Sequence, residues 1–331
     1  MKKNLIIIVL LLLITGCKSN NNYKGEVNVL NWSSYIPDSV ISDFEKEYKI
    51  KVNYGTYSSN EELLAKVTSS KEGTYDVIFP SDYMVELMIE RGIIQKIDKS
   101  KISNYKNINP IFLNQVYDPN NKYSLPFLST IVVIAYNRKN VSDDIKGYND
   151  LLNKKYKNNI VVLDDQRIII GLALMSLGYD MNETDSNKLK EAENWLLNLK
   201  GNTKAYDSDS PKTFFITDEV DLGIMWSAEA ILAKEKNDNI EIVYPKEGHA
   251  ISMDNYTILN GAKNKDNAYL FINYLMRNDV SQKIVDEYPY ISPNKNISNS
   301  IAYNDIFNNG YYVKNIGDSI KSYDKLWANI K

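Results

Sequence analysis

The sequence predicts an α/β protein of about two domains, and three observations support this prediction. The chain has 331 residues, and a single hydrophobic core stops growing at about 250 to 300 residues. Strand-like and helix-like segments alternate along the chain, a pattern typical of a mainly parallel sheet flanked by helices. Polar and aromatic residues also gather where the predicted strands end, which is where open α/β sheets bind ligands. We therefore expect a ligand site built from several strand ends.

The N-terminus has the pattern of an export signal. Two lysines precede an unbroken apolar run of ten residues, Leu5 to Ile14, whereas a helix that spans a bilayer needs roughly 20 residues. The run ends in ITGC, which resembles the bacterial lipoprotein signal, in which the cysteine is acylated and becomes the new N-terminus. We expect a signal peptide over residues 1–17, a lipid anchor on Cys17 and a polar tether over residues 18–25. The alternatives are an uncleaved anchor and a leader that is cut beside an incidental cysteine.

Cysteine content and charge narrow the classes of function. Cys17 is the only cysteine, so no disulfide can form within the chain. Hydrophobic residues make up 44% of the chain and charged residues 24%, as in ordinary globular proteins. Loss of Lys2 and Lys3 with the leader leaves 37 Lys and Arg (39 minus 2) against 42 Asp and Glu, a net charge of −5. A mildly acidic exported protein gives no electrostatic reason to expect a nucleic-acid partner.

The beginning of the chain predicts a βαβαβ unit. Between the first two strands, Val40, Phe44 and Tyr48 recur at helical spacing behind a Pro-Asp-Ser start. The second helix is expected to open with a capping box from Ser58 to Glu61. The predicted strands cover residues 27–32, 51–57 and 75–83, and the predicted helices cover residues 36–48 and 59–70.

The pattern restarts after residue 130. A strand is predicted over residues 158–165 and is followed by helices that end at Gly178 and Gly201. Residues 220–236 read as a strand that runs directly into a helix. Further periodic segments cover residues 130–140, 240–245, 252–259 and 264–277.

Five polar and aromatic clusters follow predicted strands, namely WSSY, SDY, DDQR, WSAE and MDNY. Tryptophan, tyrosine and aspartate together suit an ammonium ligand, because each ring face attracts a cation by about 0.5 to 2 kcal/mol and also packs against alkyl segments. A carboxylate about 4 Å from an ammonium contributes roughly 4 kcal/mol at an effective dielectric near 20, before desolvation is subtracted. The clusters therefore favour a flat or cationic small ligand.

Few residues are available for catalysis or for metal binding. The only histidine, His249, falls in a predicted loop and is expected at the surface, so a Ser-His-Asp triad or a multi-histidine metal site has almost nothing to work with. The chain has no Walker A loop and no G-x-G-x-x-G motif after a strand. Asp164 and Asp165 could serve a glycosidase as paired carboxylates, but neighbours along a strand point to opposite faces. We expect no enzyme activity, no cofactor and no metal.

Several other residues have structural interpretations. Trp195 shares a helical stripe with leucines and is expected in the core, Asp76 is expected to be a turn acid, and Trp327 is left open. The adjacent Tyr311 and Tyr312 invite an iron-binding interpretation, because ferric-binding transport proteins use adjacent tyrosines. With 25 tyrosines in the chain, however, one adjacent pair is expected by chance.

From Val27 to about Pro293 the chain resembles the spermidine/putrescine-binding proteins of bacterial ABC importers. The resemblance rests on an ordered series of stretches: NWSSYIP, TYSSNEELLAKV, YDVIFPSDYMVE, GIIQKIDKSKISN, YDPNNKYSLPF, VVLDD, LGIMWSA, YPKEG, MDNYTI and YISPN. It implies a two-lobed periplasmic-binding-protein fold of type II, in which each lobe is a mainly parallel sheet flanked by helices and the ligand lies in the cleft between the lobes.

The resemblance also implies which residues bind the ligand. Trp226 would stack on it, and Asp254 would be the principal ammonium-binding aspartate. The full implied set is Trp32, Ser33, Tyr35, Ser81, Tyr83, Asp165, Trp226, Asp254 and Tyr290.

The chain departs from the family pattern at three places. Ile168 stands where some members carry a glutamate, Ser252 stands where they carry a stacking tryptophan, and the family's C-terminal glutamine has no clear counterpart in SYDKLWANIK. One terminal amine would then be held differently, with Asp82 or Glu229 as replacements. These departures leave the choice between spermidine and putrescine open, while the ligand class stands.

We expect an exported, lipid-anchored, monomeric receptor that faces the periplasm or the cell exterior. It would capture spermidine, putrescine or both and deliver them to the membrane permease and ATPase of an ABC importer. Lobe 1 is expected over residues 26–129 plus 253–298, and lobe 2 over residues 130–252 plus 299–331, with crossings near Thr130 and Ser252. The alternatives are a receptor of the same fold for another solute, such as ferric iron, and an exported hydrolase.

Overall fold

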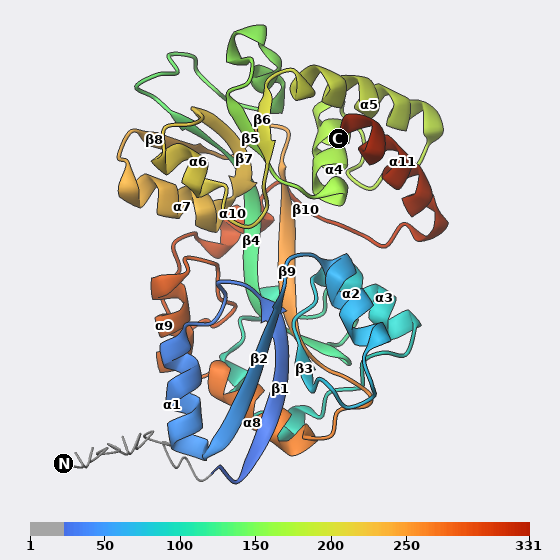
Figure 1. The fold of residues 1–331 in the computed structure, drawn as a ribbon, viewed down its shortest axis with the longest axis vertical. Coiled ribbons are helices and arrows are strands. Elements are labelled where there is room, and N and C mark those ends of the chain that lie inside the picture. Colours follow the sequence, from blue (N-terminus) through green and yellow to red (C-terminus); the bar gives the residue numbers. More distant parts are fainter. Residues whose placement is uncertain (1–22) are drawn as a thin grey trace, which may run out of the picture.

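The computed structural model describes residues 23–331 of the chain. The predicted signal peptide, Cys17 and residues 18–22 of the predicted tether lie outside the described residues. Figure 1 shows two α/β halves joined by two long strands, with β1 in the lower half and the C-terminal helix α11 in the upper half. We call the half that contains β1 lobe 1 and the half that contains α11 lobe 2.

Lobe 1 is built on three parallel strands. β1 pairs with β2 along its whole length and with β3 on its other edge. Helix α1 packs on this sheet through Val40 and Phe44, which are four residues apart and fully buried, as expected for one face of an amphipathic helix. The strands are β1 (Gly25–Trp32), β2 (Ile50–Tyr57) and β3 (Val77–Ile78), and the helices are α1 (Asp38–Tyr48), α2 (Asn60–Ser69), α3 (Asp82–Glu90), α8 (Lys265–Leu275) and α9 (Asn278–Glu287).

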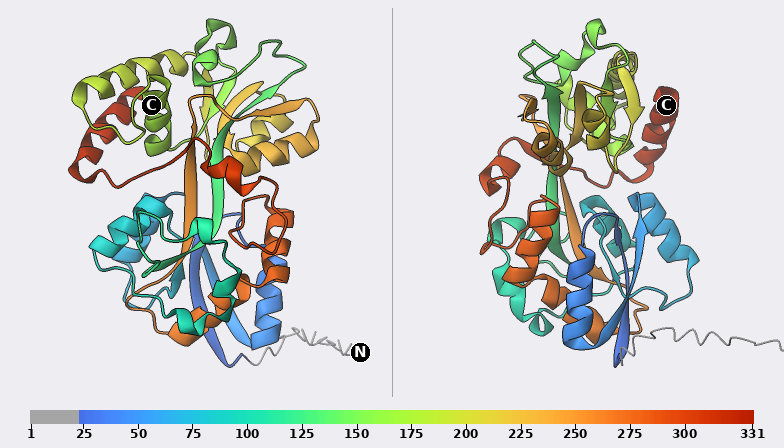
Figure 2. Two further views of the ribbon diagram at one scale, coloured as in Figure 1. Left: turned by 180° about the vertical axis from the view of Figure 1, so that it is seen from behind. Right: turned by 60° about the vertical axis from the view of Figure 1, so that its left-hand side comes forward.

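Lobe 2 repeats this plan. β5 lies between β6 and β7 and is parallel to both. Helices α4, α5 and α11 lie on one side of the lobe and α6 and α7 on the other, as the views in Figures 1 and 2 show. The strands are β5 (Ile160–Val162), β6 (Thr203–Tyr206), β7 (Leu222–Trp226) and β8 (Ile240–Val243), and the helices are α4 (Gln166–Ser176), α5 (Ser186–Lys200), α6 (Lys212–Ile216), α7 (Ser227–Lys236) and α11 (Ile320–Ile330).

Two long antiparallel strands, β4 (Ser124–Asn137) and β9 (His249–Ile258), run through both lobes. They join the lobe sheets into the strand order β2-β1-β3-β9-β4-β7-β5-β6, with β8 paired to β4 and β10 (Gly310–Tyr312) paired to β9. Thr130 pairs directly with Ser252 in this ladder, at the two positions where the crossings were expected. The short helix α10 (Tyr303–Phe307) leads into β10 on the chain's return to lobe 2.

Two local predictions in lobe 1 were wrong. The strand expected over residues 75–83 is regular only at Val77–Ile78, with one isolated bridge at Ser81, and α3 begins at Asp82. The start of α2 is also displaced by one residue. Ser59, not Ser58, caps the helix by accepting a hydrogen bond from the Glu62 amide at 3.1 Å, and the Glu62 carboxylate accepts from the Ser58 amide at 2.7 Å.

The surface position expected for His249 was also wrong. His249 is the first residue of β9 and is 2% exposed. Its Nε2 lies 2.9 Å from the Ile306 carbonyl oxygen, and burial lowers the pKa of the imidazole. The expectation for Trp195 is confirmed, because this side chain is buried in α5 and its Nε1 donates to Asn149 Oδ1 at 2.8 Å.

Asp76 has a larger structural role than that of a turn acid. Its fully buried carboxylate accepts four hydrogen bonds of 2.8 to 3.0 Å, from the backbone and side-chain nitrogens of Asn28 in β1 and of Asn264 before α8. The carboxylate therefore ties together segments that are far apart in the sequence. Removing it would leave four donors without their acceptor, and a buried unpaired donor is costly.

We predict that Asp76→Ala lowers the free energy of unfolding by about 2 to 4 kcal/mol, measured by urea denaturation of the mature protein. Asp144→Ala is the control, because the Asp144 side chain is 77% exposed, and a surface change of this kind shifts stability by only about 0.5 kcal/mol. Equal stability of the two variants would show that the Asp76 contacts do not support the fold.

Candidate functional site

A cavity of about 390 Å³ lies between the lobes and is lined by residues of both. The structure brings together along this cavity all nine residues that the sequence predicts as ligand-binding: Trp32, Ser33, Tyr35, Ser81, Tyr83, Asp165, Trp226, Asp254 and Tyr290. Whether each of them touches a ligand stays a prediction, but their convergence follows from the fold.

Strand ends explain this convergence. Trp32 is the last residue of β1, and Trp226 is the last residue of β7. Ser81 and Asp165 occupy the turns between β3 and α3 and between β5 and α4. Because the carboxyl ends of the parallel strands in each lobe face the other lobe, the residues that follow them meet across the cavity.

Asp254 forms the centre of the lobe 1 wall. Its side chain is 3% exposed, and its Oδ1 accepts hydrogen bonds from Ser81 Oγ at 2.7 Å and from Trp32 Nε1 at 3.1 Å. Burial raises the pKa of Asp254 to about 6, although the hydrogen bonds from Ser81, Tyr35 and Trp32 act in the opposite direction. The hydrogen bonds therefore fix the position of the Asp254 carboxylate, but no positive charge within residues 23–331 forms an ion pair with it.

Asp165 occupies the corresponding place in lobe 2. It is the N-cap of α4, and its Oδ1 accepts a hydrogen bond from the Ile168 amide at 3.0 Å. Burial raises the pKa of Asp165 to about 6, and the nearby charge of Glu61 in lobe 1 adds to the rise. A carboxylate from each lobe thus faces the same cavity.

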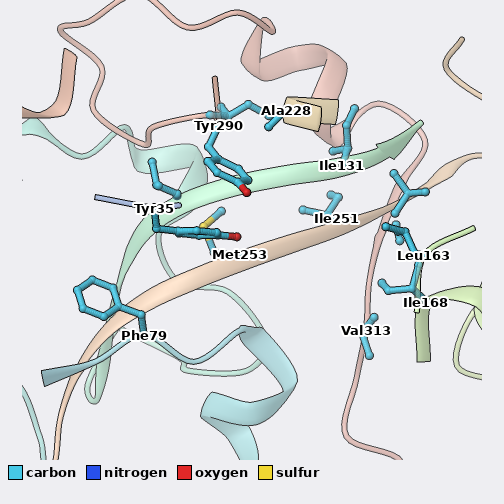
Figure 3. Packing of buried hydrophobic residues seen from close by; sticks show 14 of the residues in the cluster. Tyr35, Phe79, Ile131, Leu163, Ile168, Ala228, Ile251, Met253, Tyr290 and Val313 are labelled. Carbon is cyan, nitrogen blue, oxygen red and sulfur yellow. The ribbon is translucent and has the colours of Figure 1, made fainter. Parts of the chain in front are cut away.

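Aromatic rings cover the wall between these carboxylates. The ring centres of Tyr35 and Tyr290 are 4.4 Å apart, and Trp32 lies 6.2 Å from Tyr35 with nearly parallel ring planes. Figure 3 shows the rings of Tyr35 and Tyr290 side by side, with their hydroxyls directed toward the space bordered by Ile251 and Ile168. The cavity therefore combines flat aromatic and aliphatic surfaces with acidic groups.

In the part of the chain that the structure describes, no cation forms an ion pair with these acids. Among residues 23–331, Lys331 pairs with Asp164, which lines the cavity, and Lys212 pairs with Glu229, which does not, but no ion pair involves Asp82, Asp165 or Asp254. An unpaired buried carboxylate is costly unless it is protonated or meets an external cation. The arrangement suits a ligand with cationic groups joined by an apolar or flat segment.

The helices that begin at the cavity carry their own acids. α2, α3, α4 and α7 start there, and each has an acidic residue at its N-cap or in its first turn: Glu61, Asp82, Asp165 and Glu229. A helix N-terminus has partial positive charge and would otherwise attract an anion. Glu61 and Asp165 line the cavity and offset that charge there, which shifts the preference of the cleft toward cations, whereas Glu229 pairs with Lys212 outside the cavity.

Sequence reasoning missed several residues that line the cavity. Glu61 was interpreted only as part of a capping box, yet it accepts a hydrogen bond from the Tyr83 hydroxyl at 3.1 Å across the end of α2. The one signal that could have found it is the SSNEE run that follows the second strand. Asp324 and Trp327 of α11 reach the cavity through tertiary packing alone, and Gln166 Nε2 donates to Asp324 Oδ1 at 2.9 Å.

Asp82 and Glu229, the two residues suggested to hold a terminal amine in place of the missing family residues, differ in their position relative to the cavity. Glu229 does not line the cavity, and its carboxylate accepts hydrogen bonds from Lys212 Nζ at 2.8 and 2.9 Å, so its position does not favour the suggested role as an ammonium ligand. Asp82 does line the cavity, as do Ile168 and Ser252, the residues at two of the departures.

Contacts between the lobes border the cavity. Ser33 Oγ of lobe 1 donates a hydrogen bond to Asp209 Oδ1 of lobe 2 at 2.9 Å. Farther out, the backbone and side-chain nitrogens of Asn315 donate to Glu86 and Glu90 of α3, each at 3.2 Å. Polar contacts near the surface contribute little to stability, so these three bonds hold the lobes together only weakly.

The adjacent tyrosines point to different environments. Tyr311 is 43% exposed, whereas Tyr312 packs edge-on against Tyr117 with ring centres 6.1 Å apart.

Within residues 23–331 there is no group of three or more His, Cys, Asp or Glu side chains placed to hold a metal ion. The same part of the chain contains no helix that is both long and apolar enough to cross a membrane.

Two α/β lobes joined by long strands, with a cavity between them, are the architecture of a solute-binding receptor. Residues 39–307 match the model of the bacterial extracellular solute-binding protein family. The spermidine/putrescine-binding periplasmic protein of Salmonella typhimurium is 37% identical over 91% of this chain and 90% of its own length. A putrescine-binding periplasmic protein of Escherichia coli is 32% identical over 81% of this chain and 78% of its own.

Solved structures agree with these sequence relatives. The spermidine/putrescine transporter substrate-binding protein of Streptococcus pneumoniae has a TM-score of 0.80 at 31% identity and covers 92% of this chain and 98% of its own. A lipoprotein of Treponema pallidum has a TM-score of 0.85 at 26% identity over 92% and 99%. The chain belongs to the bacterial extracellular solute-binding protein family, in the group of the spermidine/putrescine-binding periplasmic proteins, and the predicted two-lobed fold is confirmed.

The raised pKa values predict how stability depends on pH. Asp165 and Asp254 have a pKa of about 6 in the folded protein and near 3.8 when unfolded. The folded protein therefore holds these protons more tightly, so their contribution to stability is present at low pH and is lost as pH rises through about 6. Without ligand, Asp254→Asn should show a smaller fall in the free energy of unfolding from pH 4.5 to pH 7.5 than the unchanged protein, by about 2 kcal/mol.

Urea denaturation of dialysed protein at the two pH values measures this difference. Asp318→Asn provides the control, because Asp318 is fully exposed and its loss leaves the pH dependence unchanged. Parallel curves for Asp254→Asn and the unchanged protein would contradict the assignment of a raised pKa to Asp254.

Proposed function

We propose that this receptor captures polyamines, spermidine and/or putrescine, and delivers them to the membrane permease of an ABC importer. The observation that carries the proposal is the absence, within residues 23–331, of an ion pair to Asp82, Asp165 or Asp254, three acids that line one aromatic cavity. The names of the Salmonella and Escherichia relatives support the same ligand class.

In this proposal the ligand amines lie on Asp165 and Asp254, one on each lobe. The methylene segments between them pack against Trp32, Tyr35 and Trp226, with Tyr83 beside Asp165. Each ring contact adds about 0.5 to 2 kcal/mol, and each carboxylate pair adds roughly 4 kcal/mol before desolvation. Two such pairs with stacking are sufficient for a micromolar complex, about −8 kcal/mol.

Ligand binding across the two lobes would stabilise their closed arrangement. An ammonium bound between Asp165 and the lobe 1 wall adds an attraction to the Ser33–Asp209 hydrogen bond that already joins the lobes. The closed lobes would then present one continuous surface to the permease and its ATPase. Capture and release make and break no covalent bond, so the proposal requires no catalysis.

The remaining expectations belong to this proposal as well. Lobe limits at 26–129 plus 253–298 and at 130–252 plus 299–331 follow the crossing point where Thr130 pairs with Ser252. A lipid anchor on Cys17 is supported by the ITGC pattern and by the lipoprotein of Treponema pallidum with the same fold. The protein would act as a monomer outside the cell membrane.

Titration of the mature protein with spermidine, putrescine, ferric citrate and a neutral sugar tests the ligand class. We expect heat of binding with one or both polyamines only, because only these ligands carry cationic ends on an apolar segment. A response to ferric citrate alone would favour an iron receptor of the same fold, and no response to either amine would end the polyamine proposal. Turnover of an added glycoside would revive the hydrolase alternative.

Asp254→Ala should weaken binding of the preferred polyamine by about 3 kcal/mol, because it leaves a desolvated ammonium without its partner. Isothermal titration calorimetry measures the loss. Asp266→Ala is the matched control, since it removes an exposed aspartate of α8 outside the cavity and should bind normally. Normal binding by Asp254→Ala would show that the amine site lies elsewhere.

A further inference from the structure

Asp82 is an acidic residue of the cavity for which neither the fold nor the relatives' names provide a role. It is the first residue of α3, its side chain is 1% exposed, and it lines the cavity. Its Oδ1 accepts a hydrogen bond from the Tyr83 amide at 2.7 Å, and its Oδ2 accepts one from the Met253 amide at 3.3 Å. The carboxyl group is therefore held in one orientation by the backbone of both segments.

The same contacts place Asp82 beside Asp254. Ser81 and Asp254 form an antiparallel β-bridge, and the next residue on one strand, Asp82, bonds to the residue before Asp254 on the other. Two carboxyl groups thus lie on adjoining backbone segments and border one cavity. Two neighbouring buried carboxyl groups cannot both ionise without a cation.

The groups around this pair do not supply that cation. Asp82 faces Asp254 from β9, Arg167 from α4, and the hydroxyls of Tyr117 and Tyr312. The Arg167 guanidinium donates instead to Asn182 Oδ1 at 3.2 Å and to the Lys314 carbonyl oxygen at 2.8 Å. It lowers the pKa of Asp82 from a distance but forms no ion pair with it.

Tyrosine side chains surround Asp254, the second carboxyl group of this pair. Asp254 faces Tyr35, Tyr57 and Tyr290, and burial raises the pKa of each of these hydroxyls, so all three are neutral at physiological pH. Burial, with the neighbouring Asp254 charge, also raises the pKa of Asp82 well above its usual value. Without a bound cation, burial beside Asp254 therefore favours the protonated form of Asp82.

We propose that Asp82 is a third carboxylate of the polyamine site, which joins Asp254 in binding one ammonium group and does so by releasing its own proton to solvent. This inference rests on the proposed function. The O–H bond of Asp82 breaks as the ammonium arrives, the proton goes to the buffer, and the ligand keeps all of its protons. Polyamine capture would then be coupled to proton release, and Asp82 would be a specificity-determining residue for the amine at the lobe 1 wall.

Calorimetric titration with putrescine at pH 8, in several buffers of different ionisation enthalpy, tests the proposal. At pH 8, Asp165 and Asp254 are already ionised, because their pKa is about 6, and the putrescine amines remain charged. We expect the unchanged protein to release protons when putrescine binds. In Asp82→Asn the release should fall to near zero and the affinity should drop by about tenfold or more.

The Asp82→Asn variant keeps a side-chain oxygen for the Tyr83 amide, and Asp82→Ser provides a second small acceptor, so at least one folded variant is expected; thermal unfolding confirms the fold of each. Asp266→Asn is the matched control and should retain both affinity and proton release. Binding of putrescine by the unchanged protein without proton release at pH 8, or unaltered release by Asp82→Asn, would overturn the role of Asp82. Failure of the unchanged protein to bind any polyamine would instead overturn the proposed function.

Discussion

Asp254 is fixed by Ser81 and Trp32, and Asp82 by the amides of Tyr83 and Met253, yet within residues 23–331 no lysine or arginine forms an ion pair with either. Hydrogen bonds orient these carboxyl groups but do not replace the water that burial removes. Burial without a positively charged ion-pair partner raises the pKa of both Asp82 and Asp254. An external cation between the lobes is the simplest group that satisfies the whole arrangement.

The arrangement of the helices around the cleft affects whether it prefers anions or cations. Helices that start at strand ends direct their positive ends into the cleft, which on its own would favour anions. In this chain each of α2, α3, α4 and α7 offsets that charge with an acidic residue of its own. Glu229 forms an ion pair with Lys212 and therefore cannot bind a ligand ammonium. An acid without such an ion pair remains available to the ligand.

Much of the fold and the outline of the site could be predicted from the sequence. Alternating periodicity located the strands, and the clusters WSSY, SDY and MDNY marked residues that do meet in one cavity. What could not be predicted depends on tertiary contacts. Glu61 reaches the cavity from the first turn of α2, α11 contributes Asp324 by packing, and His249 is buried as the first residue of β9. No local sequence pattern predicts these tertiary contacts.

Acids in both lobes would each require a positive charge on the ligand. Calorimetric comparison of putrescine with n-pentylamine measures this requirement, because the monoamine has nearly the same length and replaces one ammonium with a methyl group. We expect about 100-fold weaker binding of n-pentylamine, since one desolvated carboxylate is left without a partner. Equal affinity for the two ligands would show that the second ammonium is not required.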